Sequence, residues 1–493
     1  MNTTDTIRRG PLAVLLTGTF LIVLDFFAVN VALPSVQRDL SAGPTALQWL
    51  VAGYALTFGG LLMVASRLAD RRGRRRIFVL GTALFVASST VCGLAPDIRT
   101  LLVARLVQGA SAAMIGPTVL SLIGDVYTGP HRIRALGAYA TVMGVAAASG
   151  QLIGGLLIHL DIAGSGWRAI FLVNLPIGIA ALFAAPRLLP DTRVDTPPPD
   201  ALETALLVGT LTALVLPLAQ GQSQGWPLWT WLTLAGSGAL AALTGARGAA
   251  LRRRGTPRLV DVTAMRARPV GVGQLGQFLL FTGMAAYFLV LALYLQDGRG
   301  LSPLASGAVF TSVAVPYMIG TRNAARVLGR LGARAGITAG ALTLGAGHVL
   351  LLAVVEGIGT GGSVLWLVPG LAVGGAGMGV TLSGLVGAVM GSVSPQHAGT
   401  VSGTSSTLQQ AANAIGVALV ATIFFSRLRN GMVPAFEASL LYLIATTAAV
   451  ALAAGFLPGR ARATAQAPQA ATTTSATTTS ATTEAATISS TPA

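Results

Sequence analysis

Asp25 is the one acidic residue of this 493-residue chain that stands deep inside a long apolar run. A carboxyl group within a membrane span is costly unless it is protonated, paired or reached by water, so Asp25 is a functional candidate. Its reversible protonation would provide the coupling that an ion-driven carrier needs. The alternative is a structural role, in which Asp25 caps or pairs with Asn30 or with a neighbouring helix.

Arg105 is the corresponding cation, within the apolar segment that ends at Pro117. Gln108 follows three residues later and therefore shares a helical face with Arg105. We expect Arg105 to take part in proton coupling or to set the electrostatics of a substrate site. The alternative is that its guanidinium binds backbone carbonyls of a broken helix.

Small residues accompany these polar positions. Gly109 directly follows Gln108, and Gly150, Gly154 and Gly155 lie together in a later apolar run. Glycines at this spacing let two helices approach closely, so we expect all four to be helix-packing positions.

The most highly charged segment is residues 66–76, which hold six arginines and one aspartate. So dense a run must lie in water, although long apolar stretches precede and follow it. A short basic loop between two membrane spans fixes the side of the bilayer that it faces.

The elements that position these residues are membrane helices. With 53% hydrophobic residues and 61 glycines, the chain is too apolar for a soluble globule. Its apolar runs are about 20 residues long and do not alternate in polarity, which predicts an all-α integral membrane protein rather than a barrel. We expect about 14 transmembrane helices: 11–33, 47–66, 77–95, 99–121, 135–159, 168–189, 203–220, 228–246, 270–294, 305–325, 335–355, 364–390, 401–426 and 436–457. The first is expected to be a retained helix rather than a signal peptide.

The basic residues predict the orientation of these helices. Alternating the loops from a cytoplasmic N-terminus puts 25 of the 32 arginines inside, which predicts that both termini are cytoplasmic. The net charge of +16 does not indicate nucleic-acid binding, because the arginines form short clusters between spans. The sequence contains no lysine, which excludes a Walker-type phosphate loop and a lysine Schiff base. Cys92 and four scattered histidines predict neither a disulfide framework nor a metal site.

The segment Gly329–Gly336 is a degraded copy of the arginine-rich loop, which indicates two related halves. The two loops match in position only if two spans are inserted between the halves, so the expected order is six, two and six helices. This predicts a cytoplasmic N-terminus (1–10), an N-terminal six-helix bundle (11–189), a linker with two additional helices (190–268), a C-terminal six-helix bundle (269–457) and a disordered Ala/Thr/Ser-rich tail (458–493).

Five motifs in order resemble the major facilitator superfamily, specifically its 14-span branch of drug/proton antiporters. They are Leu24–Pro34, Arg67–Arg76, Arg105–Gly109, Gly150–Gly155 and Trp167–Gly178. The resemblance implies that Arg105 acts in proton transfer. It also implies a cytoplasmic gate made of Asp70, Arg71, Gly73, Arg74 and Arg75. The chain departs from the family pattern at Ser66, where glycine is usual, and at Gln151, where proline is usual.

We expect a proton-coupled efflux transporter that exports small amphipathic compounds by alternating access, with no cofactor besides the proton gradient. The predicted substrate cavity is formed by Asp25, Asn30, Arg105, Gln108 and Gln151. We expect a monomer in a bacterial plasma membrane, in contact with lipid and with small-molecule substrates and protons. The alternative is a dedicated exporter of one endogenous metabolite or lipid. A sensor or a membrane enzyme fits less well, because the sequence has no extramembrane domain and no cluster of titratable groups. Trp167 is expected to anchor the interface.

Overall fold

The computed structural model describes residues 9–193, 200–221, 224–254, 267–393 and 395–457. Within these residues the chain is helical and contains no strand, so the all-α prediction is confirmed. The predicted N-terminus (1–10) is described only at Arg9 and Gly10, and the predicted tail (458–493) lies outside the described residues, as do parts of the predicted linker.

Several helices extend past both ends of the apolar runs that predicted them, because polar turns continue them, whereas α7 and α13 begin later than the predicted spans. The helix bounds are α1 Arg9–Asp39, α2 Pro44–Arg72, α3 Arg74–Gly93, α4 Ile98–Val126, α5 Gly129–Leu160, α6 Ala169–Leu172, α7 Asn174–Leu188, α8 Ala201–Gln220, α9 Leu228–Arg253, α10 Arg268–Leu293, α11 Pro303–Leu331, α12 Ala333–Ile358, α13 Val368–Met390, α14 Pro395–Arg427 and α15 Met432–Gly455.

The number of helices that could cross a membrane is slightly below the predicted 14. Among the described residues, twelve helices are long and apolar enough, or thirteen if the bent helix α5 is one span. The predicted span 228–246 is helix α9, which is not among them. Tryptophan, glycine, serine and threonine dilute the aliphatic residues of α9, and its last turns carry arginine.

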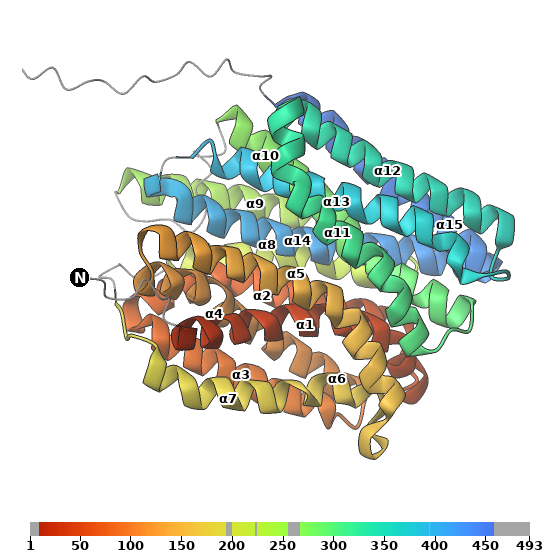
Figure 1. The fold of residues 1–493 in the computed structure, drawn as a ribbon, viewed down its shortest axis with the longest axis horizontal. Coiled ribbons are helices and arrows are strands. Elements are labelled where there is room, and N and C mark those ends of the chain that lie inside the picture. The colour runs from red at the N-terminus through yellow and green to blue at the C-terminus, as the bar shows by residue number, and fades with distance from the viewer. Residues whose placement is uncertain (1–8, 194–199, 222–223, 255–266, 394, 458–493) are drawn as a thin grey trace, which may run out of the picture. The chain divides into compact units, whose positions relative to one another are not determined.

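The helices outside α8 and α9 form two groups by their mutual contacts. In the first, α1 contacts α5 and α7, while α4 contacts α2 and α3. In the second, α13 contacts α11 and α12, while α10 contacts α14 and α15. We call these the N-terminal bundle (α1–α7) and the C-terminal bundle (α10–α15), and Figure 1 shows them in red to yellow and in green to blue.

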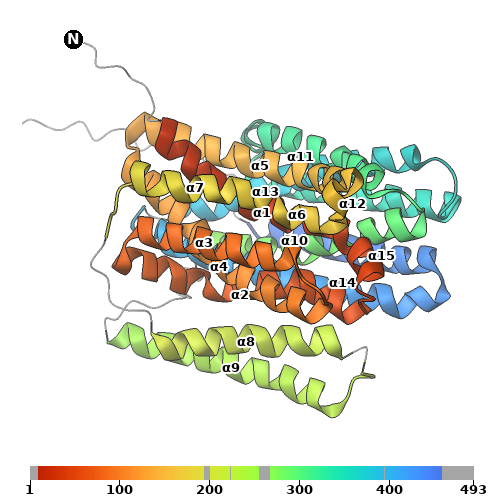
Figure 2. The same cartoon turned by 90° about the horizontal axis from the view of Figure 1, so that it is seen from below.

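The helix pair α8 and α9 belongs to neither bundle (Figure 2). Helix α8 contacts α2 of the N-terminal bundle and α14 of the C-terminal bundle, whereas α9 packs mainly on α8. The Thr422 hydroxyl donates to the carbonyl of Leu218 at 3.1 Å, which ties α8 to α14. The side chain of Arg247 on α9 donates to both oxygens of Asp200 at the start of α8.

One glycine separates α2 from α3, and one separates α11 from α12. Gly73 has φ of 110° and Gly332 has φ of 85°, values that residues with a side chain rarely adopt. When Gly329–Gly336 is aligned with residues 66–73, Gly336 corresponds to Gly73. In the structure, however, α11 ends and α12 begins about one turn earlier, on either side of Gly332. Ala69 stands at the position equivalent to Gly332, so α2 continues to the next glycine.

Candidate functional site

A buried polar cluster lies inside the N-terminal bundle. It consists of Asp25 (α1), Ser89 (α3), Arg105 and Gln108 (α4) and Asn174 (α7), and we call it the N-terminal polar cluster. Each of its residues is at most 2% exposed. Helices that are apolar on nearly every side carry these few polar groups, whose partners are mostly one another and nearby backbone carbonyls.

Three donors surround the carboxylate of Asp25. One oxygen accepts from Nη1 of Arg105 at 2.5 Å, and the other accepts from the side-chain amides of Gln108 at 2.9 Å and Asn174 at 3.1 Å. Ser89 accepts from the same two amides, which holds them in place. The alternative partner, Asn30, donates to the carbonyl of Phe26 instead.

The guanidinium of Arg105 meets both a charge and a backbone acceptor. In addition to Asp25, it donates through Nε to the carbonyl of Leu50 at 3.3 Å, and its Cζ lies 4.4 Å from the centre of the Tyr54 ring. Helix α2 is unbroken at Leu50, so this contact differs from the predicted binding to a broken helix. Nη2 of Arg105 is buried and has no hydrogen-bond partner in the described structure. The guanidinium is therefore paired with Asp25 but has one donor without an acceptor, which allows it to change partners.

A cavity of about 1710 Å³ lies between the two bundles. Its wall includes aromatic rings and thioethers from both bundles: Phe26, Phe27, Phe58, Tyr139, Phe281, Phe288, Phe310, Tyr317, Met63, Met143, Met284, Met318 and Met378. Polar groups in the wall include Gln151 from α5 and three amides of α14, namely Gln409, Gln410 and Asn413. An apolar wall with a few amides suits an amphipathic ligand of drug size.

The predicted set of cavity residues needs correction. Gln151 lines the cavity, whereas Asp25, Asn30, Arg105 and Gln108 do not. The reason is helix rotation: Phe26 and Phe27 face the cavity, and Asp25 points into the bundle, where it finds its partners. The charged pair thus lies next to the cavity wall but not in it.

The cavity is closed at the end that lies away from the arginine-rich loop. The rings of Phe27 and Phe288 meet edge to face at 5.2 Å, the amide of Gln296 donates to the carbonyl of Val31 at 2.8 Å, and Arg38 pairs with Asp297 at 3.2 Å. All three contacts join α1 to the end of α10 and the turn after it, and so join the two bundles. At its other end the cavity reaches charged residues of both bundles: Arg67, Asp70, Arg74 and Arg322.

The predicted gate residues form a charge network within the N-terminal bundle. Arg74 donates to Asp70 at 2.8 Å and to Asp125 of α4 at 2.5 Å. Arg75 and Arg76 approach Asp191, which follows α7, at 3.8 and 3.1 Å.

Two other predicted gate residues have different surroundings. Arg71 is exposed. Gly73 is buried, and a methyl group at its Cα would collide with Asp191.

The glycines predicted to pack helices lie at close approaches. A Cβ on Gly109 would meet Tyr54 of α2, and a Cβ on Gly154 would lie 3.1 Å from the carbonyl oxygen of Ala28 in α1. Gly150 lies against α1 in the same way, with Phe27 Cβ 2.9 Å from the added carbon. Gly155 instead lies against Pro303 of α11, and therefore at the contact between the bundles.

The structure adds residues that the sequence reasoning did not select. Asn174 and Ser89 complete the shell around Asp25, and Asp125 and Asp191 complete the loop network. Asn174 is an amide within an apolar helix, which is a signal that could have marked it. Trp167 corrects the prediction of an interfacial anchor: it is 3% exposed, and its indole donates to Asp39 at 2.9 Å.

Metal binding has no candidate in the described part of the chain, where no group of three or more His, Cys, Asp or Glu side chains could hold an ion.

Comparisons with known proteins extend these observations. Residues 15–264 match the family model of the Major Facilitator Superfamily. A probable actinorhodin transporter of Streptomyces coelicolor is 36% identical over 424 residues, which cover 85% of this chain and 73% of that protein. A puromycin resistance protein of Streptomyces alboniger is 37% identical over 438 residues, covering 85% and 82%. A cephamycin export protein of Amycolatopsis lactamdurans is 33% identical over 415 residues, covering 83% of each.

Solved structures with the same fold include an auto-inhibited peptide transporter of the POT family. It has a TM-score of 0.63 and 17% identity, and the match covers 90% of this chain and 95% of that one. A POT family transporter in complex with 5-aminolevulinic acid has a TM-score of 0.63 and 14% identity, with 92% and 97% covered. At these identities the likeness concerns the fold. The motifs, the two bundles around one cavity and the sequence relatives together show that the chain belongs to the Major Facilitator Superfamily and is a membrane transporter.

Proposed function

We propose that this chain is a proton-coupled exporter of small amphipathic compounds in a bacterial plasma membrane. The observation that carries the proposal is the cavity of about 1710 Å³ between the bundles, which is closed at one end and reaches the charged loop residues at the other. Two bundles that rock around such a cavity would expose it to each side of the membrane in turn.

The cavity wall favours planar or aromatic substrates with few charges. Its rings and thioethers offer stacking and adaptable contacts, and its amides offer a few hydrogen bonds. The charged lining residues are at the arginine-loop end, where a substrate would pass rather than rest. The relatives named for actinorhodin and puromycin support such a substrate class.

Proton coupling would act through Asp25. In the structure, its carboxylate is paired with Arg105, and protonation would remove the charge that holds this guanidinium. Arg105 would then change partners next to a wall formed by Phe26 and Phe27, which offers a route from proton binding to the cavity.

The arginine-rich loop would face the cytoplasm, since this placement gives the strongest bias of arginine toward one side. The structure would then be the inward-facing state. In that state a compound could enter the cavity from the cytoplasm, while the contact between Arg38 and Asp297 closes the outside.

The test is uptake into inverted membrane vesicles, with labelled puromycin and a tetracenomycin as probes and an imposed pH gradient. We expect the wild type to accumulate a probe, and collapse of the gradient to abolish accumulation. Asp25→Asn should lose gradient-driven accumulation but keep downhill movement. Accumulation that survives collapse of the gradient in the wild type would contradict proton antiport.

A dedicated exporter of one endogenous metabolite is the second candidate, which the relative named as a probable actinorhodin transporter favours. The same vesicles separate the two, because a dedicated exporter would accumulate one compound of a structurally mixed panel. A multidrug exporter would accumulate several compounds that share only size and amphipathic character.

A further inference from the structure

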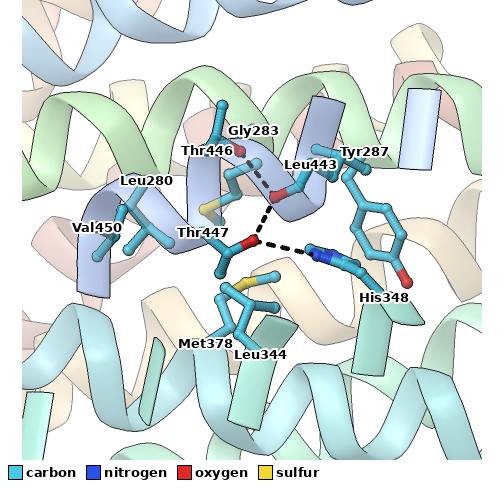
Figure 3. A pocket seen from close by; sticks show the side chains of 11 residues that line it. Leu280, Gly283, Tyr287, Leu344, His348, Met378, Leu443, Thr446, Thr447 and Val450 are labelled. Atoms are coloured by element: carbon cyan, nitrogen blue, oxygen red, sulfur yellow. Dashed lines mark hydrogen bonds between the residues drawn. The ribbon is translucent and has the colours of Figure 1, made fainter. Parts of the chain in front are cut away.

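Among the described side chains of the C-terminal bundle, one histidine is buried: His348, in the middle of α12. Its side chain lies beside a small void of about 20 Å³, which is enough for one water molecule. Figure 3 shows the imidazole opposite Thr447 of α15, with the ring of Tyr287 (α10) beside it. The ring centres of His348 and Tyr287 are 5.3 Å apart.

The hydrogen bonds of Thr447 decide which ring nitrogen of His348 carries a proton. A hydroxyl has one hydrogen, and Thr447 donates it to the carbonyl of Leu443 in its own helix. With that hydrogen used, the Thr447 oxygen can accept from Nδ1 of His348 at 3.4 Å, which favours the tautomer with its hydrogen on Nδ1. In that tautomer the basic lone pair of the imidazole is on Nε2.

Two flexible side chains separate the void from the central cavity. Met284 of α10 and Met378 of α13 line both spaces. Methionine has three rotatable bonds and adapts readily, so rotation of either side chain would connect the void to cavity water. A second hydroxyl, that of Thr446, also lines the void and offers a hydrogen bond to water.

Among the described residues, no charged side chain lines the void, so an ion pair there does not explain a histidine at this depth. The other titratable residue in its wall is Tyr287. Helix α13 has no titratable residue. The neighbouring helices carry further titratable residues that do not line the void: Glu437 and Tyr442 in α15, Tyr317, Arg322, Arg326 and Arg330 in α11, Arg268 in α10, and Arg334 and Glu356 in α12.

We propose that His348 is a second proton-binding site of this transporter, reached from the central cavity past Met284 and Met378. Nε2 accepts a proton from cavity water to give an imidazolium, and returns it to water when the bundles change state. Each bundle then contains one titratable site, Asp25 in the first and His348 in the second. This inference rests on the proposed proton-coupled export.

The first test counts protons per transported molecule in inverted vesicles, with labelled puromycin and a trapped pH indicator. If two sites contribute, His348→Gln should lower the ratio by about half. Glutamine keeps a hydrogen-bonding side chain for Thr447 but does not titrate, so a merely structural histidine predicts an unchanged ratio. His159→Gln is the matched control, since His159 is exposed at the end of α5.

A second variant fills the void and leaves the histidine in place. A methyl group at Gly283 would lie 3.2 Å from Cδ2 of Leu443 and 3.3 Å from Oγ1 of Thr446, within the space that the water would occupy. We expect Gly283→Ala to lower the proton ratio as His348→Gln does. A normal ratio in both folded variants would overturn the proposal.

The third measurement does not depend on transport. In protein with carbon-13-labelled histidine, the ring signal that His348→Gln removes should shift reversibly between about pH 4 and pH 8. A signal that stays constant over this range would overturn proton binding at His348. If the wild type showed no proton-coupled export but this signal titrated, the proposed function would fail while the proton site stood.

Discussion

The N-terminal and C-terminal bundles bury their polar side chains in different ways. The first pairs a carboxylate with a guanidinium and surrounds them with two amides and a hydroxyl, all at most 2% exposed. Among the described residues, the second buries neutral groups, which include the amides Gln274 and Gln277 and the imidazole of His348 beside threonines and a void. In the first, the two charges neutralise each other, whereas the neutral imidazole in the second has hydroxyl groups but no charged residue of the described chain around it. The comparison shows that two bundles of one fold can bury polar groups with different charge and different partners.

The junctions at Gly73 and Gly332 repeat this difference. Both break a pair of long helices with one glycine at positive φ. Around Gly73 stands a network of arginines and aspartates, whereas the copy has alanine at the position equivalent to Asp70. The two junctions therefore share a break at a glycine with positive φ, but in the described part of the chain only the junction at Gly73 has this network of arginines and aspartates around it.

The largest effect on stability should come from the buried ion pair. Arg105→Ala leaves the carboxylate of Asp25 without its cation, and we expect a loss of about 3–5 kcal/mol in free energy of unfolding. Thermal unfolding in detergent measures this loss. Asp25→Asn combined with Arg105→Gln should recover most of it, because no charge is then left buried.

The matched experiment in the C-terminal bundle sharpens this prediction. Removing the imidazole in His348→Gln leaves no unpaired charge, so the loss in stability should be clearly smaller than for Arg105→Ala. An equal loss would show that the two buried sites are energetically alike.

The glycine junctions should give an intermediate effect. A residue with a side chain at positive φ costs about 1–3 kcal/mol, so both Gly73→Ala and Gly332→Ala should lower thermal stability. We expect the larger loss for Gly73→Ala, since its new methyl group also meets Asp191. The order of the two melting temperatures is the measurement, and the reverse order would contradict the role of Asp191.

The smallest effect should come from the helix pair that lies outside both bundles. Hydrogen bonds from Arg247 lower the pKa of Asp200 below its ordinary value of 3.8. The stabilisation by this pair is thus present above the unfolded-state pKa and is lost as the pH falls through the folded-state pKa. Spin labels on α8 and α9 should show a broader distance distribution below that pH.

Asp200→Asn should broaden this distribution already at neutral pH. Asp97→Asn is the matched control, because hydrogen bonds from Thr100 lower the pKa of Asp97 too, but at the start of α4. A wild-type distribution that stays narrow at low pH would show that apolar contacts alone hold α9.

The sequence by itself determined the helices, their approximate ends and the polar groups that need partners. Apolar runs of bilayer length must become helices, because only a helix satisfies its own backbone there. The depth of Asp25 and Arg105 in those runs marked them for the same reason: an isolated charge in hydrocarbon is expensive. Asn174 is a weaker case of the same kind, because an amide inside an apolar run also needs a hydrogen-bond partner but carries no charge.

Only the tertiary structure decided which way these residues face. The helices around the N-terminal polar cluster are apolar on nearly every side, so no polar stripe in the sequence fixes their rotation. Packing places Phe26 in the cavity wall and Asp25 inside the bundle, and it brings Asp191 to Arg75 across 116 residues of chain. The place of His348 beside a void that four helices line was likewise unreadable in the sequence, because a cavity is a property of packed side chains.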